Sequence, residues 1–431
     1  MNKYFNYQKG KGFIEGCRIS ALAEKYGTPL YIYSEKAIRE SVSRFQKAFS
    51  GIAPIIRYSC KANSNLHLLK ILKSAGCGTD VISPGELTIA LTAGFAPQNI
   101  IMEGVGKRED EIEFGLKKGI SFFSVESLPE LATLNRLSSK QKRVITALLR
   151  LNPDIAAGGH RYISTGKKEN KFGLTETEVV SVLKKPVDFP NLKINGLHLH
   201  LGSQIDSPEP YLKAIKEAQR LHQIYPFQFL DLGGGFPITY DTEMAEIEIF
   251  GKAICGAIKK FNLSPHRVHP LSSALERAPV PARGEGIRVI FEPGRHFIAP
   301  AGFLLTRVIY RKDRPHKRFL VVDAGMNDLI RPALYEAFHH IWPTKEVTEE
   351  LVFFDVVGPV CESGDFLGKE RLLPNTLKEG DLLLIGETGA YGFAMSSNYN
   401  GRLRPAEVLI SGKKSCIIRK RETLKNLTAQ F

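Results

Sequence analysis

Short apolar runs rich in β-branched residues recur along the first part of the chain, and segments with helical periodicity separate them. The runs predict eight strands, near residues 55–60, 78–83, 99–103, 122–126, 145–151, 194–201, 229–232 and 287–292. Between the first two strands, Leu66, Leu69 and Leu72 fall on one helical face, and Gly76 ends the segment. Eight strands alternating with helices predict an α/β fold, a (β/α)8 barrel over roughly 30–300.

The pattern changes after about residue 300, where strand-like runs follow one another without helical segments between them. Examples are LLTRVIY, RFLVVDAG and LVFFDVVGPV, and turn signals such as KEGD separate them. We therefore expect a TIM-like barrel domain over 33–298 and a separate all-β domain, a barrel or a sandwich, over 299–431. Residues 1–32 follow neither pattern, so periodicity does not assign them.

The composition is typical of a globular protein, with 43% hydrophobic and 24% charged residues. No window approaches about 18 uninterrupted apolar residues, so we expect no membrane span. The first residues contain no apolar core of a secretory signal. The six cysteines are dispersed and form no C-x-x-C pair, which argues against a zinc ribbon or a disulfide scaffold. We therefore expect a cytoplasmic protein.

The net charge is +14, and its densest cluster is RKDRPHKR at 311–318. No stacking aromatic residues and no nucleic-acid motif accompany this cluster, so we interpret it as surface charge and expect no nucleic-acid partner. The positive balance favours an anionic small molecule as substrate and as cofactor.

Polar residues or glycines close every predicted strand of the barrel. In chain order they are Lys61, Ser83, Glu103, Glu126, Arg150 with Asn152, His200 with Ser203, Gly233–Gly235, and Glu292 with Arg295. In barrels of this type the chemistry lies at the C-terminal ends of the strands. Any one of these residues alone has a plain structural explanation, but their coincidence predicts a reactive site at one mouth of the barrel.

Three of these groups suit cofactor chemistry. A lysine such as Lys61, partly desolvated at a barrel mouth, becomes an amine nucleophile, as Schiff-base chemistry requires. The bare backbone of Gly233–Gly235 can approach a phosphate, and Ser203 can add a hydroxyl donor. A carboxylate such as Glu292 beside a pyridine nitrogen favours the protonated ring, which is the stronger electron sink. The alternative for Glu292 is an ion pair with Arg295.

His198 and His200 alternate on one strand, so they share a face. The His-x-His spacing also occurs among metal ligands. In metal-dependent barrel hydrolases such a pair usually closes the first strand, whereas here it closes the sixth. We therefore predict no metal, and expect His200 to stack on a planar cofactor and His198 to be a core residue.

Several long motifs resemble those of the diaminopimelate decarboxylases, which are fold type III (alanine racemase-like) pyridoxal-phosphate enzymes, and the resemblance runs nearly end to end. The motifs are YSCKAN at 58–63, GTDVISPGEL at 78–87, HRYISTGKKENKFG at 160–173, HLHLGSQ at 198–204, LDLGGGF at 230–236, EPGR at 292–295, VDAGMNDLIRPALY at 322–335, GPVCESGDFL at 358–367 and TGAYGFAMSSNYNGR at 388–402. One departure is Arg161, where family members commonly have proline.

The resemblance implies pyridoxal 5'-phosphate as cofactor, with Lys61 as its Schiff-base lysine and His200 stacked on its ring. It implies cofactor contacts from Ser203, Gly234, Gly235, Glu292, Gly294, Arg295 and Tyr391. It implies substrate contacts from Arg295, Arg331, Tyr335, Glu362 and Tyr391. Cys361 resembles the family's proton donor.

The family's reaction converts meso-2,6-diaminopimelate to L-lysine and carbon dioxide, the last step of lysine biosynthesis. The family's Cys361 segment comes from the partner subunit, so the resemblance implies a homodimer with shared active sites. It also implies that residues 1–32 join the β-domain. From the residues themselves, Pro332 after Arg331 suits a helix start.

Other functions remain open at this stage. The nearest is decarboxylation of ornithine, lysine, arginine or carboxynorspermidine on the same fold. An amino acid racemase is a second, although it would favour a basic residue at position 292. A metal-dependent barrel hydrolase and a non-catalytic cofactor carrier are more remote.

Overall fold

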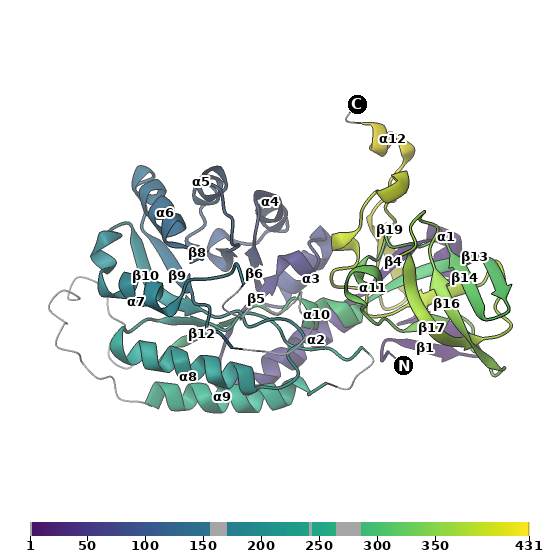
Figure 1. Ribbon diagram of the computed structural model, residues 1–431, viewed down its shortest axis with the longest axis horizontal. Coiled ribbons are helices and arrows are strands. Elements are labelled where there is room, and N and C mark those ends of the chain that lie inside the picture. The colour runs from purple at the N-terminus through teal and green to yellow at the C-terminus, as the bar shows by residue number, and fades with distance from the viewer. Residues whose placement is uncertain (1, 156–169, 241–243, 264–285, 430) are drawn as a thin grey trace. The chain divides into compact units, whose positions relative to one another are not determined.

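The computed structural model describes residues 2–155, 170–240, 244–263, 286–429 and 431. The chain divides into two compact units. The barrel unit comprises 42–237 and 244–294, and the β unit comprises 1–41, 238–243 and 295–431 (Figure 1). Arg161 lies outside the described residues, as does most of the motif around it.

Eight parallel strands close the barrel unit. They are β5 (Ile55–Ser59), β6 (Gly78–Val81), β7 (Ile100–Met102), β8 (Phe122–Val125), β9 (Ile145–Arg150), β10 (Leu192–His198), β11 (Phe229–Asp231) and β12 (Arg288–Phe291). Each pairs with its neighbour in chain order, and β12 returns to β5 through the pair Ile290 and Ile55. The predicted (β/α)8 barrel is therefore confirmed, strand by strand.

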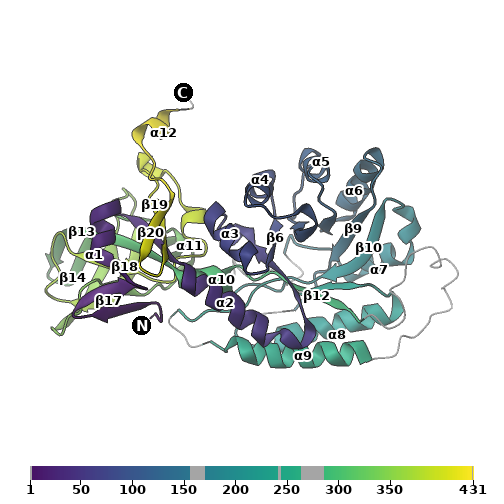
Figure 2. The same ribbon diagram turned by 180° about the vertical axis from the view of Figure 1, so that it is seen from behind.

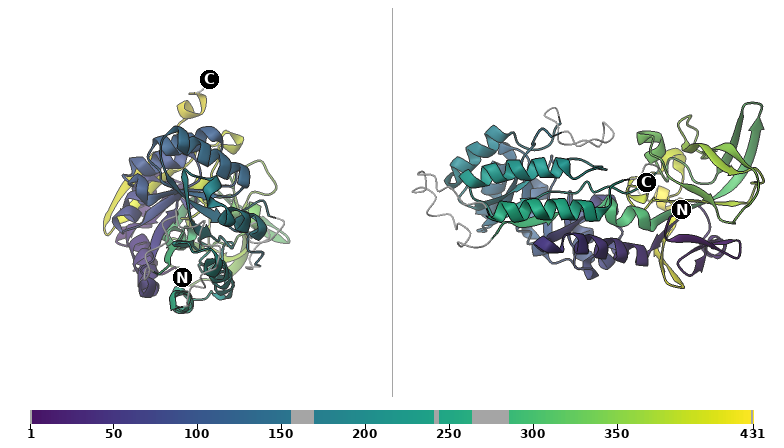
Figure 3. Two further views of the ribbon diagram at one scale, coloured as in Figure 1. Left: turned by 90° about the vertical axis from the view of Figure 1, so that its left-hand side faces the viewer. Right: turned by 90° about the horizontal axis from the view of Figure 1, so that it is seen from below.

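Helices surround these strands. They are α2 (Glu35–Ala48), which continues from the β unit, α3 (Leu66–Ser74), α4 (Pro84–Thr92), α5 (Glu109–Lys117), α6 (Leu128–Lys140), α7 (Glu176–Lys184), α8 (Glu209–Ile224) and α9 (Ile247–Leu263). Helices α3 to α6 stand side by side on the outside of the barrel (Figure 2), and α8 lies along α9 (Figure 3).

The helix boundaries follow local sequence signals. Ser83 accepts a hydrogen bond from the backbone of Glu86 at the start of α4, with Pro84 in the first turn. Ser127 caps α6 in the same way. Gly76 follows α3 with φ at +88°, a conformation that favours glycine, as its predicted place at the helix end requires.

The two ends of the barrel interior differ in polarity. Ile101, Leu148, Phe229 and Ile290 form a small apolar cluster, against which Phe122 packs. Polar and charged side chains lie on the strands and turns toward the other end.

The β unit is built on one large sheet. Its path runs β17 (Phe366–Pro374), β16 (Leu351–Val357), β14 (Lys317–Val322), β13 (Gly302–Arg314), β4 (Leu30–Ser34), β19 (Ala406–Ser411) and β20 (Lys414–Arg419). Off this path, β18 (Leu382–Ile385) pairs with both β13 and β15 (Ile341–Pro343). A second sheet contains β1 (Phe5–Gln8), β2 (Lys11–Ile14) and β3 (Cys17–Arg18). The expected all-β domain is confirmed.

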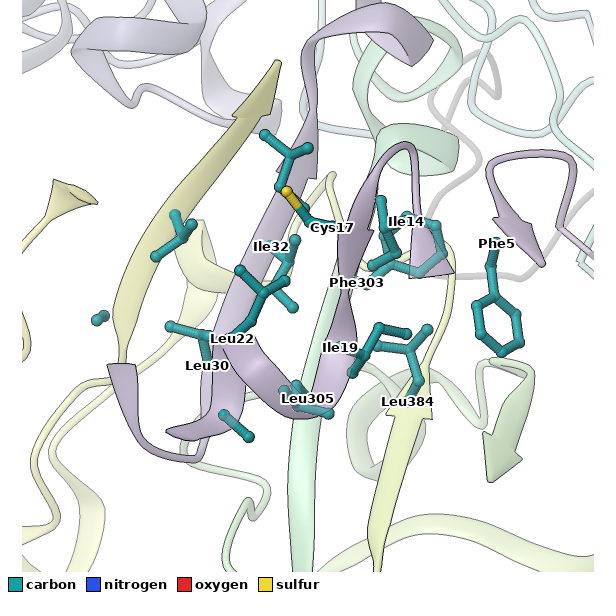
Figure 4. Close-up of a cluster of buried hydrophobic side chains, with 14 residues drawn as sticks. Phe5, Ile14, Cys17, Ile19, Leu22, Leu30, Ile32, Phe303, Leu305 and Leu384 are labelled. Carbon is teal, nitrogen blue, oxygen red and sulfur yellow. The ribbon is translucent and has the colours of Figure 1, made fainter. Parts of the chain in front are cut away.

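Residues between Phe5 and Ser34 contribute to the core of the β unit. Strand β4 lies between β13 and β19, so it is interior to the large sheet. Phe5, Ile14 and Ile19 pack in one buried cluster with Phe303 and the later strands (Figure 4). Within the described residues, no helix is long and apolar enough to cross a membrane.

Candidate active site

Lys61 lies in a short 3-10 turn, Cys60–Ala62, that follows β5 directly. Asp80 on β6 fixes this turn through two hydrogen bonds. One oxygen of its carboxyl accepts from Ser59 Oγ at 2.9 Å, and the other accepts from the backbone N–H of Cys60 at 2.8 Å. Burial and the nearby charge of Glu103 raise the pKa of Asp80 to about 8, although the Lys61 ammonium opposes the shift. The site therefore couples Lys61 electrostatically to a buried acid.

Four buried carboxyl groups gather at the polar end of the barrel: Asp80, Glu103, Asp231 and Glu292. Oxygens of Asp80, Glu103 and Glu292 lie within 4.8 Å of one another. Burial raises the pKa of Asp231 to about 7, and the charge of Glu103 adds to it. Burial and the charges of neighbouring carboxylates therefore favour the protonated forms of Asp80, Asp231 and Glu292.

Glu292 lies immediately after β12 and is 3% exposed. Its backbone N–H donates to the carbonyl of Gly233, which ties the turn after β12 to the glycine loop. Burial, followed by the charges of Asp231 and Glu103, raises its pKa well above the ordinary value. Within the described residues, Glu292 Oε1 has no hydrogen-bond partner. A buried acceptor of this kind fits the protonated nitrogen of a pyridine ring.

His198 is fully buried, as a core residue should be, but it also contacts the acidic cluster. Its Nδ1 lies 2.7 Å from Ser124 Oγ and 3.6 Å from Glu103. Its Nε2 lies 3.5 Å from Glu292 Oε2. Burial, and then the charge of Arg150, hold the pKa of His198 well below its usual range, so the ring is neutral.

His200 follows β10, and its ring packs against the glycine loop. Its Nδ1 accepts from the backbone N–H of Gly234 at 3.4 Å. A Cβ on Gly233 would lie 2.7 Å from the same nitrogen, so only glycine leaves room for the ring. Burial, and then the charge of Lys61, hold the pKa of His200 well below its usual range. A neutral imidazole in this position can stack on a flat aromatic ring.

The glycine loop after β11 is held closely against the loop after β10. Gly235 has φ at +97°, and a Cβ on it would lie 2.6 Å from the carbonyl of Gly202. Its carbonyl accepts from Ile205, and Tyr211 Oη donates to the carbonyl of Gly234 at 2.6 Å. Ser203 lies on the facing loop. The two loops thus form a cradle of bare backbone that side chains would fill, which suits the close approach of a phosphate.

Gly294 joins this cradle to the turn that carries Lys61. A Cβ on Gly294 would lie 2.8 Å from that of Ser59, and the N–H of Ser59 donates to the carbonyl of Pro293. The close approach explains why glycine stands in the EPGR motif.

The β unit holds a second group of predicted site residues. Arg295 begins α10 (Arg295–Ile298), and its guanidinium lies 4.8 Å from the ring centre of Tyr391. Arg331 begins α11 (Arg331–Tyr335), which confirms the helix start expected from Pro332. Arg331 and Arg295 are only 5% and 8% exposed. Buried guanidinium groups are costly unless anions meet them, so they are candidates for binding carboxylates.

Cys361 and Glu362 lie on an exposed loop of the β unit. The N–H of Cys361 donates to Asn400 Oδ1 at 2.8 Å, and Glu362 Oε1 accepts from Ser363 and Gly364 of its own loop. Asp365 shapes this loop by accepting from Met326 and Val360. Within each unit the predicted residues are thus brought together, except that these two side chains face solvent.

Several charged residues of the site were not singled out from the sequence. Asp80, Asp231 and the buried Arg57 lie inside barrel strands, where a charge in an apolar run is the available signal. Tyr240 and His339, which contact the buried arginines, carry no such signal, because tyrosine and histidine are ordinary residues in loops.

Comparison with known proteins identifies relatives over the whole chain. The pyridoxal-dependent decarboxylase family, through its pyridoxal binding domain, matches residues 35–299. Diaminopimelate decarboxylase from Neisseria meningitidis is 40% identical over 423 residues, which cover 97% of this chain and 98% of its own. Its counterpart from Vibrio cholerae is 40% identical over 436 residues, covering 99% and 98%.

Solved structures similar to this chain include members of the same family. Diaminopimelate decarboxylase from M. jannaschii has a TM-score of 0.89 and 34% identity, covering 100% of this chain and 98% of its own. The Helicobacter pylori enzyme complexed with L-lysine has a TM-score of 0.85 and 36% identity, covering 95% and 98%.

Proposed function

The chain belongs to the pyridoxal-dependent decarboxylases and, within them, to the diaminopimelate decarboxylases, and from this membership we propose that it converts meso-2,6-diaminopimelate to L-lysine and carbon dioxide. The observation that carries the proposal is 40% identity over 97% of the chain, which takes in both units. The lysine bound by the Helicobacter pylori relative is the product of this reaction, which supports the choice of substrate.

Pyridoxal 5'-phosphate, when bound, supplies an electron sink for the negative charge left as carbon dioxide departs. Lys61 would hold the cofactor through Nζ, on a turn that Asp80 fixes. Glu292 would keep the ring nitrogen protonated, because a cation beside its buried carboxyl favours the ionised acid. His200 would pack on the face of the ring as a neutral imidazole.

The phosphate would lie in the cradle formed by the loops after β10 and β11. Gly235 would donate its backbone N–H and Ser203 its hydroxyl, while Gly234, whose N–H donates to His200, would line the cradle without a side chain. Gly294 would allow the EPGR turn to approach. We assign Arg295 and Tyr391 to the cofactor as well, as the family resemblance implies.

Recognition of the substrate falls to residues of the β unit. Diaminopimelate carries two carboxylates, and guanidinium groups such as those of Arg295 and Arg331 bind carboxylates through paired N–H donors. Tyr335 and Tyr391 would add hydroxyl contacts, while Glu362 would accept from the amino group at the far end. After carbon dioxide leaves, Cys361 would donate the proton from its thiol.

We also propose that the enzyme is a homodimer in which each subunit lends the Cys361 loop to its partner. The exposure of Cys361 and Glu362 supports this assignment. Mixing two inactive variants, Lys61→Ala and Cys361→Ala, tests it. Random exchange would restore about one quarter of full activity, because half the dimers would hold one intact site. No recovery after verified exchange would contradict shared sites.

We place the enzyme in the cytoplasm. All six cysteines are unpaired, and four of them are buried, which suits a reducing compartment. Cell fractionation with activity as the marker would check this.

The central test measures turnover of meso-diaminopimelate, ornithine and lysine by the purified, cofactor-loaded protein. We expect carbon dioxide and L-lysine from diaminopimelate, and little release from the other two. Lys61→Ala should lose both the activity and the visible absorbance of the bound cofactor. A clear preference for ornithine, or racemisation without carbon dioxide, would overturn the proposal.

One observation favours a second candidate, a metal-dependent hydrolase. Single ligand atoms of His198, His200 and Glu292 lie within 4.8 Å of one another. Metal analysis of the purified protein decides between the two. Stoichiometric zinc without cofactor absorbance would favour the hydrolase.

A further inference from the structure

Tyr240 bridges two buried guanidinium groups in the β unit. Its Oη lies 3.1 Å from Arg295 Nη1 and 2.9 Å from Arg331 Nη1. Both arginines donate to the same oxygen, which is itself buried. No sequence motif includes Tyr240. The roles proposed above for Arg295 and Arg331 do not involve it.

The electrostatics of this group indicate that it is built to receive anions. Burial alone would raise the pKa of Tyr240, but the charges of Arg331 and Arg295 outweigh it and lower the pKa below its ordinary value. The other partner of Arg331 is His339 Nε2 at 2.9 Å. Neither partner is a carboxylate. Arg331 Nε has no hydrogen-bond partner within the described residues. This buried N–H is therefore able to bind an acceptor from a ligand.

The remaining contacts fix the tautomer of His339 and support the ring of Tyr240. His339 Nδ1 lies 2.8 Å from the carbonyl of Gly386, so Nδ1 donates and Nε2 accepts from Arg331. The Tyr240 ring meets His339 edge to face, and Arg331 lies 5.1 Å from its ring centre. Phenylalanine would keep these ring contacts and lose only the bridging oxygen.

We propose that Tyr240 is a positioning residue for substrate recognition: its hydroxyl holds Arg295 and Arg331 at a shared anchor, so that N–H groups of the pair are presented to the carboxylate that the substrate keeps. The inference rests on the proposed function. It predicts that Tyr240 contributes to the preference for a dicarboxylic amino acid over a monocarboxylic one. The anchor also limits repulsion between the two cations by placing a partly negative oxygen between them.

The test compares Tyr240→Phe with the wild-type enzyme and with Tyr7→Phe. Tyr7 Oη donates to the carbonyl of Pro343 at 2.7 Å, so the control removes a tyrosine hydrogen bond elsewhere in the same unit. We expect Tyr240→Phe to raise KM for meso-diaminopimelate by about 10- to 100-fold, the range for a hydrogen bond to a charged group. The inhibition constant of cadaverine, a diamine of the same chain length with no carboxylate, should rise less. Melting temperature and cofactor content should match those of Tyr7→Phe.

A spectroscopic titration gives a readout independent of turnover. In cofactor-free protein, a phenolate that forms at lower pH than ordinary tyrosine should appear in the wild type and in Tyr7→Phe, and be missing from Tyr240→Phe. Equal loss of affinity for both ligands, unchanged KM, or an unchanged titration would each overturn the role of Tyr240. An inactive wild-type enzyme would instead refute the proposed function, which keeps the two failures distinct.

Discussion

Individual carboxyl groups at the barrel mouth illustrate how burial prepares a site for a cation. Asp80, Asp231 and Glu292 would each be ionised in water, yet burial and mutual repulsion raise the pKa of every one. A protonated cofactor ring is the cation that the proposed function supplies.

This cluster predicts how the stability of the cofactor-free protein depends on pH. The folded-state pKa of Asp231 is about 7, against an ordinary value of 3.8. Folding therefore binds this proton more tightly, and the stabilisation, full below about pH 4, is lost as pH rises through 7. We expect Asp231→Asn to gain melting temperature relative to the wild type progressively over this range, as measured by calorimetry.

The control for this experiment is Asp188→Asn, which changes an exposed carboxylate of the same unit. Its difference from the wild type should stay flat with pH. A flat difference for Asp231→Asn as well would show that this acid is not buried in its protonated form.

At the scale of elements, the site depends on how closely loops approach one another. The loops after β10, β11 and β12 meet through glycines, and a single backbone hydrogen bond from Glu292 to Gly233 joins two of them. Aromatic packing fixes the same region, since Phe236 stacks on Tyr211 with ring centres 5.2 Å apart. A rigid cradle reduces the entropy that phosphate binding would otherwise cost.

Gly235→Ala tests this cradle. Its φ of +97° disfavours alanine, and the added Cβ would meet the Gly202 carbonyl and Ile205. We expect cofactor affinity to fall by about tenfold or more, with a stability loss of about 1–3 kcal/mol from backbone strain. Equilibrium dialysis and denaturant unfolding measure the two effects.

Gly256→Ala is the matched control. Gly256 lies within α9, and a Cβ there would meet nothing within 4 Å. Alanine should therefore leave cofactor affinity unchanged and stabilise the helix by up to about 1 kcal/mol. Similar behaviour of both variants would contradict the role assigned to the cradle.

At the scale of the whole molecule, the β unit is formed by segments from both ends of the chain. Phe5, Ile14 and Ile32 pack with Phe303 and Leu384 (Figure 4). The first three precede the barrel in the sequence, and the last two follow it. Strand β4 accordingly pairs with β13 and β19. The β unit therefore needs both ends of the chain before its core can close.

Phe5→Ala should expose this dependence. Phe5 is 2% exposed, so its truncation should destabilise the β unit by about 3–5 kcal/mol. Phe431→Ala removes the same side chain at a fully exposed position and should cost nothing measurable. Urea unfolding of both variants measures the difference. Equal stabilities would show that the N-terminal segment adds little to this core.

The sequence by itself determined the barrel, the all-β domain and most of the residues proposed for the site. Period and turn signals are local properties, so the eight strands and the end of the first helix at Gly76 can be read from them. Lys61, His200 and Glu292 could be proposed as site residues because parallel strands place their carboxyl ends together, which is a rule of topology.

Only the tertiary structure decided which side chains share a proton or a charge. Three features join residues that are far apart in the chain. They are the acidic cluster around Glu292, the contact of His198 with Glu292, and the hydrogen bonds of Tyr240 to two arginines. Their pKa shifts arise from burial and from distances of a few ångströms, and neither quantity is encoded in local periodicity. For the same reason, the pattern of residues 1–32 did not predict which unit they join, because their packing partners lie some three hundred residues later in the chain.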